Sequence, residues 1–185
     1  MLTVGMDEVG RGCWAGPLVA GAVIFNRPMR ELRDSKQLTK SKREILDARI
    51  REQALCYGLG WVSAKEIDEL GLTLATTLAM QRALESITVG YDEIIIDGNL
   101  NFLPGNPKAR AIIKADDTVP VVSAASILAK VARDDYMADA ANEYPEYGFT
   151  SHVGYGTKLH MERLRLHGVS ELHRLSFKPV AALIQ

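Results

Sequence analysis

Cysteine is scarce in this sequence, with two residues among 185, Cys13 and Cys56. Two isolated cysteines supply neither a disulfide framework nor the ligand spacing of a cysteine metal site. Both are flanked by apolar residues, so we interpret them as small core side chains in a protein of the reducing cytoplasm.

Long hydrophobic runs are also missing. The longest uncharged apolar strand candidate is residues 18–25, which is far too short to span a bilayer, and no apolar segment follows a basic start. These absences argue against a membrane span and a secretory leader. We therefore expect a soluble, unprocessed protein without membrane contact.

The sequence has no excess of charge of either sign, because 22 Lys and Arg stand against 23 Asp and Glu. The charge is nevertheless unevenly spread. Residues 27–51 hold nine basic and four acidic residues, and residues 151–185 hold five and two. Two basic surfaces around an acidic centre suit a phosphate backbone that passes a metal site. An equally open alternative is that residues 40–51 form the solvated face of a helix.

All four histidines lie in residues 151–185. None is paired with a cysteine, and only His160 and His167 fall on one expected helix, seven residues apart, which disfavours a zinc site. We expect His152, His160, His167 and His173 to contact solvent or nucleic acid.

With 47% hydrophobic residues, the chain can bury one substantial core, and we expect a single α/β domain. Strands are expected at residues 2–7, 18–25, 57–62, 93–97 and 109–114, with the first two able to pair as a hairpin. Helices are expected at residues 40–55, 63–71, 72–87, 123–144 and 158–167. The three consecutive isoleucines before Asp97 predict a strand covered on both faces.

Local signals predict how these helices begin and which sides face inward. Ser63 and Glu66 match a capping box, and Ser123 and Thr157 are expected to cap their helices. The expected inward residues are Leu74, Leu78, Ala79 and Leu84 in one helix, and Ile45, Leu46, Ile50, Ala54 and Leu55 in another.

The stretch MDEVGRG, residues 6–12, sets two acids beside a glycine-rich turn. Neighbouring side chains of a strand point to opposite faces, so Asp7 and Glu8 can serve one site only if the chain turns there. Gly10 and Gly12 can supply that turn and admit a phosphate or sugar close to the backbone, while Arg11 offers a guanidinium. A solvated turn after an edge strand is the alternative, and the spacing alone does not decide between the two.

Two further acids stand where chain elements end or begin. Asp97 closes the isoleucine strand, although acids at strand ends also serve simply to start turns. Asp116 precedes the long helix, where a loop can carry its carboxylate towards the strand ends, whereas Asp134 and Asp135 are expected on the helix surface. Three or four carboxylates without Cys or His suit the hard cations Mg²⁺ and Mn²⁺.

Several motifs together resemble the ribonuclease HII family. They are DEVGRG with AGPLVAGAVI (residues 7–12 and 15–24), DSKQL (34–38), IDGN (96–99), KAD (114–116), SAASILAK (123–130), GYGT (154–157) and HRLSFKPV (173–180). They span nearly the whole chain in the family's order. The resemblance implies a ribonuclease H-like mixed β-sheet flanked by helices, with a catalytic core over about 1–144 and a small helical C-terminal region over about 145–185 that helps to bind substrate.

The resemblance also implies an activity and a site. Members of the family hydrolyse the RNA strand of RNA/DNA hybrids and nick 5′ of single ribonucleotides in duplex DNA, leaving 5′-phosphate and 3′-hydroxyl ends, in ribonucleotide excision repair and DNA replication. By similarity, the catalytic and metal-binding residues are Asp7, Glu8, Asp97 and Asp116, with two Mg²⁺ or Mn²⁺ ions, and the adjacent Asp117 leaves the fourth ligand open. The implied substrate-binding residues are Gly10, Arg11, Gly12, Lys36, Asn99 and Tyr155.

Some features depart from the family or leave rivals open. Many relatives have a lysine where this chain has Val153, which puts one backbone contact in doubt. The end KPVAALIQ shows no aromatic tail for a sliding clamp, and we expect a monomer. The rival functions are a non-catalytic nucleic-acid binding module, disfavoured because acids repel phosphate, and another metal-dependent DNA phosphoryl-transfer enzyme of the same fold, such as a resolvase or integrase.

Overall fold

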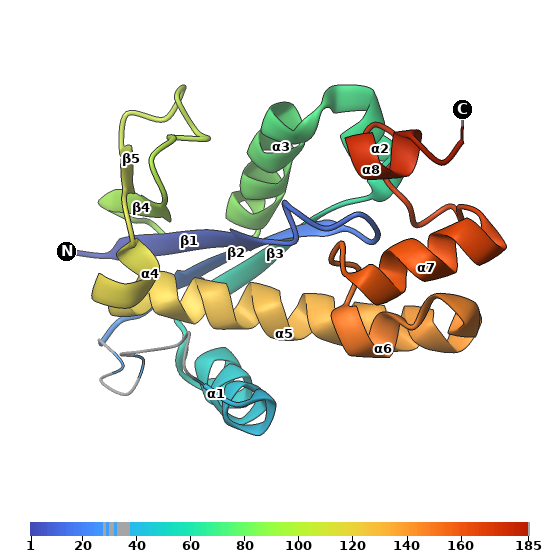
Figure 1. The fold of residues 1–185 in the computed structure, drawn as a ribbon. Helices are drawn as coiled ribbons and strands as arrows, with labels where there is room; N and C mark the ends of the chain where they lie inside the picture. Colours follow the sequence, from blue (N-terminus) through green and yellow to red (C-terminus); the bar gives the residue numbers. More distant parts are fainter. Residues whose placement is uncertain (28, 30–31, 33–37, 185) are drawn as a thin grey trace.

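A five-stranded mixed sheet forms the centre of the computed structural model, which describes residues 1–27, 29, 32 and 38–184 (Figure 1). Its strands are β1 (Thr3–Val9), β2 (Leu18–Ile24), β3 (Cys56–Val62), β4 (Glu93–Asp97) and β5 (Ala109–Ile112), in the spatial order β3-β2-β1-β4-β5. β1 runs antiparallel to β2, which confirms the expected hairpin, and parallel to β4. The fold is therefore the predicted mixed α/β sheet, with β1 in the middle.

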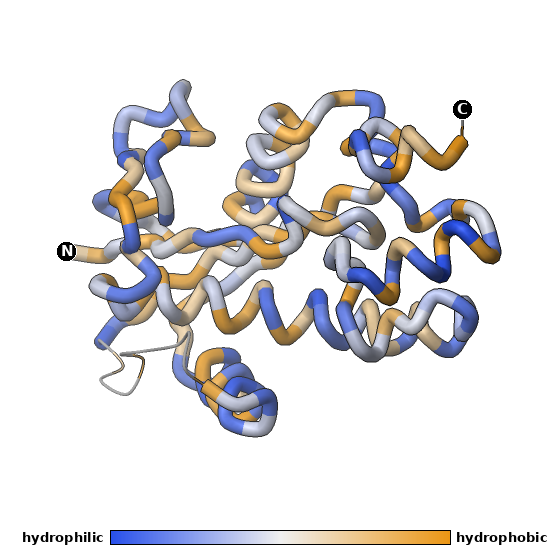
Figure 2. Tube along the Cα trace, viewed as in Figure 1, coloured by the Kyte–Doolittle hydropathy of each residue, from blue (hydrophilic) through white to orange (hydrophobic). Residues whose placement is uncertain are grey.

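Helices cover both faces of the sheet. On one face lie α2 (Ala64–Leu70) and α3 (Leu72–Glu85), and on the other lie α5 (Pro120–Glu143) and α1 (Lys40–Gln53) (Figure 1). All seven residues of β2 are buried, as are Ile94, Ile95 and Ile96, because apolar side chains on each face meet a helix layer. Figure 2 accordingly shows hydrophobic colours along the strands and alternating colours along α5. None of the helices in the described ranges is long and apolar enough to cross a membrane.

The α3 layer approaches the sheet very closely because small residues meet there. Ala75, Ala79, Met80 and Ala83 are the apolar residues that α3 buries, and a Cβ at Gly60 would overlap the Ala79 carbonyl. This close approach turns α3 so that Leu74 is 59% exposed, and its predicted inward position is wrong. In the α1 segment the corresponding errors are Ile45 and Leu55. Ile45 is 61% exposed because Leu46 and Ile50 face α5 instead, and Leu55 is 44% exposed because α1 ends at Gln53.

Helix starts follow the sequence signals in two of three cases. The Ser63–Glu66 capping box is present, and the Thr157 hydroxyl accepts the His160 N–H. Ser123, however, lies inside α5 rather than capping it. The helix begins three residues earlier at Pro120, whose fixed φ favours the first helical position, and the Ser123 hydroxyl donates to the Asp116 carbonyl.

The C-terminal region packs as a separate helical cluster against the end of α5. It contains η3 (Pro145–Tyr147), α6 (Phe149–His152), α7 (Lys158–His167) and α8 (Lys178–Ala181), around a core that includes Ala15 and Met137. Backbone hydrogen bonds join this region to the loop after β1, with Trp14 N–H donating to the Gly154 carbonyl at 2.8 Å. Segments far apart in sequence therefore form one surface.

Three of the four histidines lie inside this C-terminal cluster, so the expectation of solvent or nucleic-acid contact is wrong for them. His152, His160 and His173 are 5%, 0% and 2% exposed, and only His167 is exposed. Their rings pack against Tyr147 and Phe149, and each ring nitrogen has a hydrogen-bond partner. These hydrogen bonds offset the free-energy cost of removing the imidazoles from water. Burial lowers the pKa of His160 and of His173 to about 4.

This burial predicts a loss of stability in mild acid. The unfolded chain takes up protons on His160 and His173 near pH 6.5, whereas the folded chain does so only near pH 4, so the free energy of unfolding falls as the pH drops between these values. Urea unfolding at several pH values measures the slope. A His160→Asn variant, which cannot titrate there, should show a smaller slope, and an unchanged slope would contradict the assignment.

Close packing predicts a second stability effect at Gly5 in β1. A Cβ at this position would overlap the Val121 backbone at the start of α5, so Gly5→Ala should lower the free energy of unfolding by about 3 kcal/mol. The matched control is Gly90→Ala, because no atom lies within 4 Å of a Cβ there, and it should change stability by less than about 0.5 kcal/mol. Equal effects in chemical denaturation would refute this packing argument.

Candidate active site

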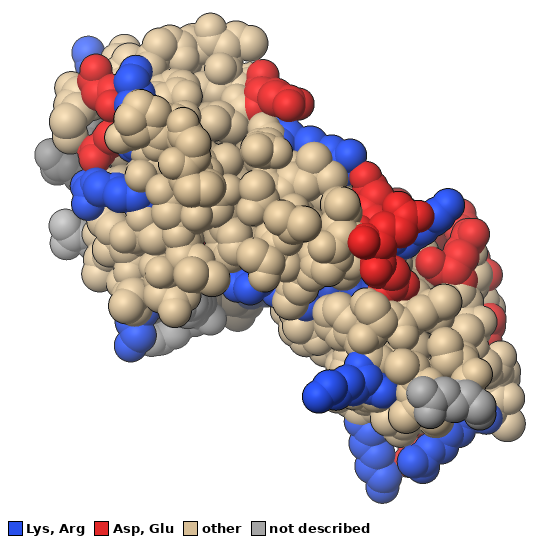
Figure 3. Space-filling view, turned by 90° about the horizontal axis from the view of Figure 1, so that it is seen from above, with Lys and Arg blue, Asp and Glu red and all other residues tan. Residues whose placement is uncertain are grey.

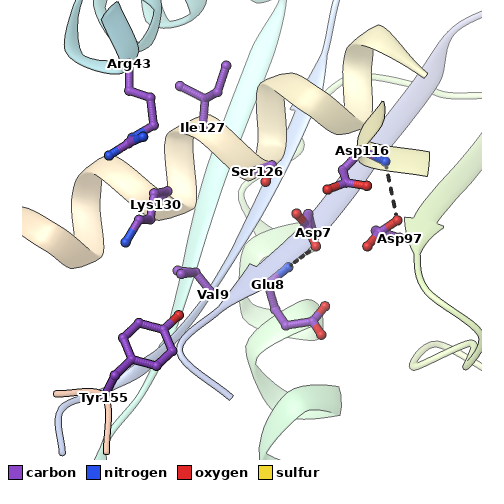
Figure 4. A pocket seen from close by; sticks show the side chains of 10 residues that line it. All are labelled: Asp7, Glu8, Val9, Arg43, Asp97, Asp116, Ser126, Ile127, Lys130 and Tyr155. Atoms are coloured by element: carbon purple, nitrogen blue, oxygen red, sulfur yellow. Dashed lines mark hydrogen bonds between the residues drawn. The ribbon is translucent and has the colours of Figure 1, made fainter. Parts of the chain in front are cut away.

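Three carboxylates that are distant in sequence meet at one end of the sheet. Asp7 on β1, Asp97 at the end of β4 and Asp116 in α4 (Ala115–Thr118) each bring one oxygen into a group whose members all lie within 4.8 Å of one another (Figure 4). In the described part of the chain, no other group of three or more His, Cys, Asp and Glu meets this criterion. The acids line a pocket of about 440 Å³.

The position of Asp7 follows from the pairing of β1. Val4 and Met6 belong to the core on the α3 side, so the alternation along the strand turns Asp7 towards α5 and its Ser126 (Figure 4). Burial raises the pKa of Asp7 well above its usual value, the Ser126 hydrogen bond opposes this, and the charges of Glu8 and Asp97 raise it further. The fold thus holds an acid where its ionised form is disfavoured.

Glu8 reaches the same pocket from a different direction. β1 stays extended to Val9, so the turn begins at Gly10 and not at the acid pair itself, and Figure 4 shows Glu8 pointing away from Asp7. The turn thus lies at the glycines that the sequence predicted, but it follows the acid pair, because pairing with β2 keeps the backbone extended through Val9. Burial raises the pKa of Glu8, while Arg11, 3.4 Å from its Oε1, lowers it.

Asp97 and Asp116 are linked directly. The Asp116 N–H donates to Asp97 Oδ1 at 3.3 Å, and the Ser123 hydroxyl of α5 holds the Asp116 carbonyl. Asp116 is 2% exposed and belongs to the carboxylate group, whereas its neighbour Asp117 is exposed. The short helix α4 therefore places the predicted Asp116, and not Asp117, in the carboxylate group.

The donor set fits a hard divalent cation. Carboxylate oxygens without sulfur or nitrogen ligands suit Mg²⁺ and Mn²⁺. Within the described residues, Glu8 Oε2 is buried and has no hydrogen-bond partner, and such a buried oxygen is costly unless an ion satisfies it. A cation would also favour the ionised forms that burial and mutual repulsion disfavour at Asp7 and Glu8.

The opposite wall of the pocket carries the predicted Tyr155 and three groups that the sequence did not single out. These are Ser126 and Lys130 of α5 and Arg43 of α1 (Figure 4). Lys130 also pairs with Asp134 at 2.7 Å. The signal was present, since Ser126 and Lys130 are four residues apart and so share a helix face. The pocket thus joins an acidic end to a cationic side.

The loop after β1, which contains Gly10, Arg11 and Gly12 and is called the glycine-arginine loop, lies beside this pocket and is fixed by buried arginines. Arg174 donates to the carbonyls of Arg11 and Gly16, and Arg133 donates to those of Ala15, Pro17 and Val153. Both guanidinium groups are 0% exposed. Gly10 needs its φ of 90°, and a Cβ there would overlap Arg133, while Gly12 is exposed with open space around it. Neither arginine was singled out from the sequence.

Among the described residues that were predicted to bind substrate, Tyr155 lines the pocket, whereas Gly10, Arg11, Gly12 and Asn99 do not. Asn99 is exposed in the loop after β4 and does not line the pocket. Lys36 lies outside the described residues. The expected basic surfaces are described only in part, and on the face shown in Figure 3 acidic and basic side chains lie mainly at the edges of a large uncharged area.

Comparison with known proteins gives a consistent family match. The family model described as Ribonuclease HII matches residues 4–180. Ribonuclease HII from Marinomonas sp. (strain MWYL1) is 46% identical over 187 residues, covering 100% of this chain and 94% of that protein. Its counterpart from Janthinobacterium sp. (strain Marseille) is 49% identical over 182 residues, covering 97% and 86%.

Solved structures agree with the fold. The crystal structure of ribonuclease H2 from Pyrococcus horikoshii OT3 aligns with a TM-score of 0.85 and 28% identity, over 99% of this chain and 97% of that one. Bst-RNase HIII in complex with Mn²⁺ aligns with a TM-score of 0.77 over 100% of this chain and 69% of that one, and at 20% identity this likeness shows the fold alone.

The separation of Asp116 from Asp117 predicts different metal responses. Binding of Mn²⁺ to the folded chain should raise the melting temperature, and Asp116→Asn should remove most of that rise because it deletes one member of the carboxylate group. Asp117→Asn is the matched control and should keep the rise. Thermal unfolding with and without Mn²⁺ measures both, and loss of the response in the Asp117 variant alone would reverse the assignment.

Proposed function

The chain belongs to the ribonuclease HII family and is an endoribonuclease of the ribonuclease H type, and from this premise we propose that it nicks duplex DNA on the 5′ side of single embedded ribonucleotides and cuts the RNA strand of RNA/DNA hybrids. The products are 5′-phosphate and 3′-hydroxyl ends. The observation that carries the proposal is the meeting of Asp7, Asp97 and Asp116 beside a pocket that also holds Tyr155.

In the proposed mechanism, the residues that hold divalent ions are Asp7, Asp97 and Asp116, with Glu8 from the side. Two such ions would supply water activation and charge neutralisation at a phosphate. Glu8 has one buried oxygen without a hydrogen-bond partner in the described part of the chain, which suits a ligand that completes its bonding only with a cation. The Arg11 guanidinium keeps Glu8 oriented through its contact with Oε1.

The remaining pocket residues are proposed to bind the sugar-phosphate backbone. Lys130 and Arg43 stand on the wall opposite the acids, where their charges offset phosphate. The ribose 2′-hydroxyl distinguishes RNA from DNA, and we assign its recognition to the backbone of Gly10, Arg11 and Gly12 together with Tyr155. The tyrosine is 40% exposed at the pocket edge, which leaves its ring accessible to a sugar.

Each rival function fits the site less well. A non-catalytic binding module has no use for three carboxylates held within 4.8 Å, since they repel phosphate unless a cation intervenes. A DNA resolvase or integrase shares the need for metal but not the need to recognise a 2′-hydroxyl. The family match favours the ribonuclease over both rivals.

The decisive assay uses a DNA duplex that carries one ribonucleotide. With Mg²⁺ or Mn²⁺ the strand should be nicked 5′ of that residue, and EDTA should abolish the reaction. Asp97→Asn should reduce the rate by about two orders of magnitude or more while duplex binding remains, because it removes a proposed metal ligand and not a phosphate contact.

Two comparisons make this assay specific. Asp139→Asn replaces an exposed acid on α5 and should leave the rate unchanged. An all-DNA duplex of the same sequence and an all-DNA four-way junction should both stay intact. Cutting of the junction in preference to the ribonucleotide duplex would contradict the proposal and favour a DNA resolvase instead.

A further inference from the structure

The three buried histidines surround the loop that presents Tyr155. His160 Nδ1 lies 3.0 Å from the Tyr155 carbonyl oxygen, and His152 Nδ1 accepts the Gly154 N–H at 3.2 Å. The rings of His152 and His160 are stacked, with centroids 4.3 Å apart and an interplanar angle of 16°. His160 thus holds the peptide group that follows Tyr155, and His152 holds the peptide group between Val153 and Gly154.

The hydrogen-bond partners fix the proton positions on all three rings. A carbonyl only accepts, so His160 carries its proton on Nδ1. The Ser170 N–H donates to His173 Nδ1 at 2.9 Å, so His173 carries its proton on Nε2 and donates it to His160 Nε2, 3.0 Å away. His152 likewise donates from Nε2 to the Tyr147 carbonyl at 2.9 Å. Every ring is neutral, and a second proton on any of them would face another donor.

The loop needs such fixing because its backbone is strained. Val153 has a φ of 43°, in the left-handed region that β-branched residues rarely adopt. Its carbonyl accepts from the buried Arg133, and its N–H donates to the Phe149 carbonyl. A Cβ at Gly156 would overlap the indole of Trp14, whose ring also packs on His160. Contacts with Arg133, Phe149 and Trp14 therefore fix this short segment.

We propose that His160, oriented by His173, is a positioning residue that holds Tyr155 at the edge of the carboxylate pocket, and that His152 supports the same loop. The inference rests on the proposed function in one respect, since it takes Tyr155 to be the residue that reads the ribonucleotide. No imidazole of the cluster lines the pocket, so the cluster acts through the loop and not on the substrate (Figure 4).

Two substitutions at His160 separate its two hydrogen bonds. Asparagine places an amide nitrogen at the same number of bonds from the backbone as Nδ1, so His160→Asn can still donate to the Tyr155 carbonyl but leaves His173 without its acceptor. Glutamine reaches the Nε2 position, so His160→Gln can still accept from His173 but loses the donor to Tyr155. A purely structural role predicts similar effects from both variants.

Nicking kinetics on the single-ribonucleotide duplex with Mg²⁺ give the first test. His160→Gln should raise KM by about five-fold, as expected for one hydrogen bond, with kcat within about two-fold of the wild type, while His160→Asn should stay close to the wild type in both constants. In a Tyr155→Ala background, His160→Gln should have no further effect on KM. Equal losses in the two His160 variants, or additive losses with Tyr155→Ala, would overturn the proposal.

A second measurement does not depend on activity. Hydrogen exchange should be faster at the Tyr155 and Thr157 amides in His160→Gln but not in His160→Asn, because the first variant frees the loop. Long-range ¹H–¹⁵N spectra should show protons on Nδ1 of His160 and Nε2 of His173. If the wild type does not nick the single-ribonucleotide duplex but these exchange and NMR results hold, the proposed function fails and the positioning role stands. Unchanged exchange in His160→Gln would end the positioning role.

Discussion

The structure depends on the pairing of β1 with β4, because this parallel contact holds together acids that repel one another. Met6 lies opposite Ile96, so the next residues along the two strands, Asp7 and Asp97, emerge at the same end of the sheet. The apolar residues before them are buried between two helix layers, which supplies the free energy that keeps like charges close. A divalent cation at this point would convert repulsion into attraction.

A second constraint joins the C-terminal region to this end of the sheet. Arg133 and Arg174 are fully buried and donate only to backbone carbonyls in the hydrogen bonds that the described residues show. Arg174 donates to carbonyls of the loop after β1, and Arg133 donates both to that loop and to Val153, so the Arg133 guanidinium connects the loop after β1 with the loop that carries Tyr155. Burial lowers the pKa of Arg174 to about 10, yet the group keeps its proton at neutral pH. The pocket therefore contains residues from two regions, the carboxylate end of the sheet and the C-terminal loop that carries Tyr155.

The carboxylate site and the histidine cluster have opposite effects on the stability of the fold. Raised pKa values at Asp7 and Glu8 show that the ionised site lowers stability in the absence of a cation. By contrast, the histidine cluster next to Tyr155 has matched donors and acceptors and aromatic packing, which stabilises the loop despite the backbone strain at Val153. Such a division is typical of proteins in which a destabilising functional site is held by surrounding residues whose hydrogen bonds are all made.

The sequence by itself determined the elements and most of the acids. The isoleucine run before Asp97, the hairpin of the first two strands and the capping box at Ser63 follow from periodicity and local hydrogen bonding, and the motif order indicated the family. It also singled out Tyr155 between its glycines. These features are readable because each depends on neighbours in the chain.

Only the tertiary structure decided which acids share one neighbourhood and what the histidines do. The family resemblance favoured Asp116 but left Asp117 open as the fourth ligand, and the fold separates the two by burying Asp116 in α4 against Asp97. The sequence predicted His160 to be a surface residue because its partners, His173 and the Tyr155 carbonyl, come together only when α7 packs on the C-terminal loops. Long-range contacts of this kind depend on chain topology, and no local pattern in the sequence encodes them.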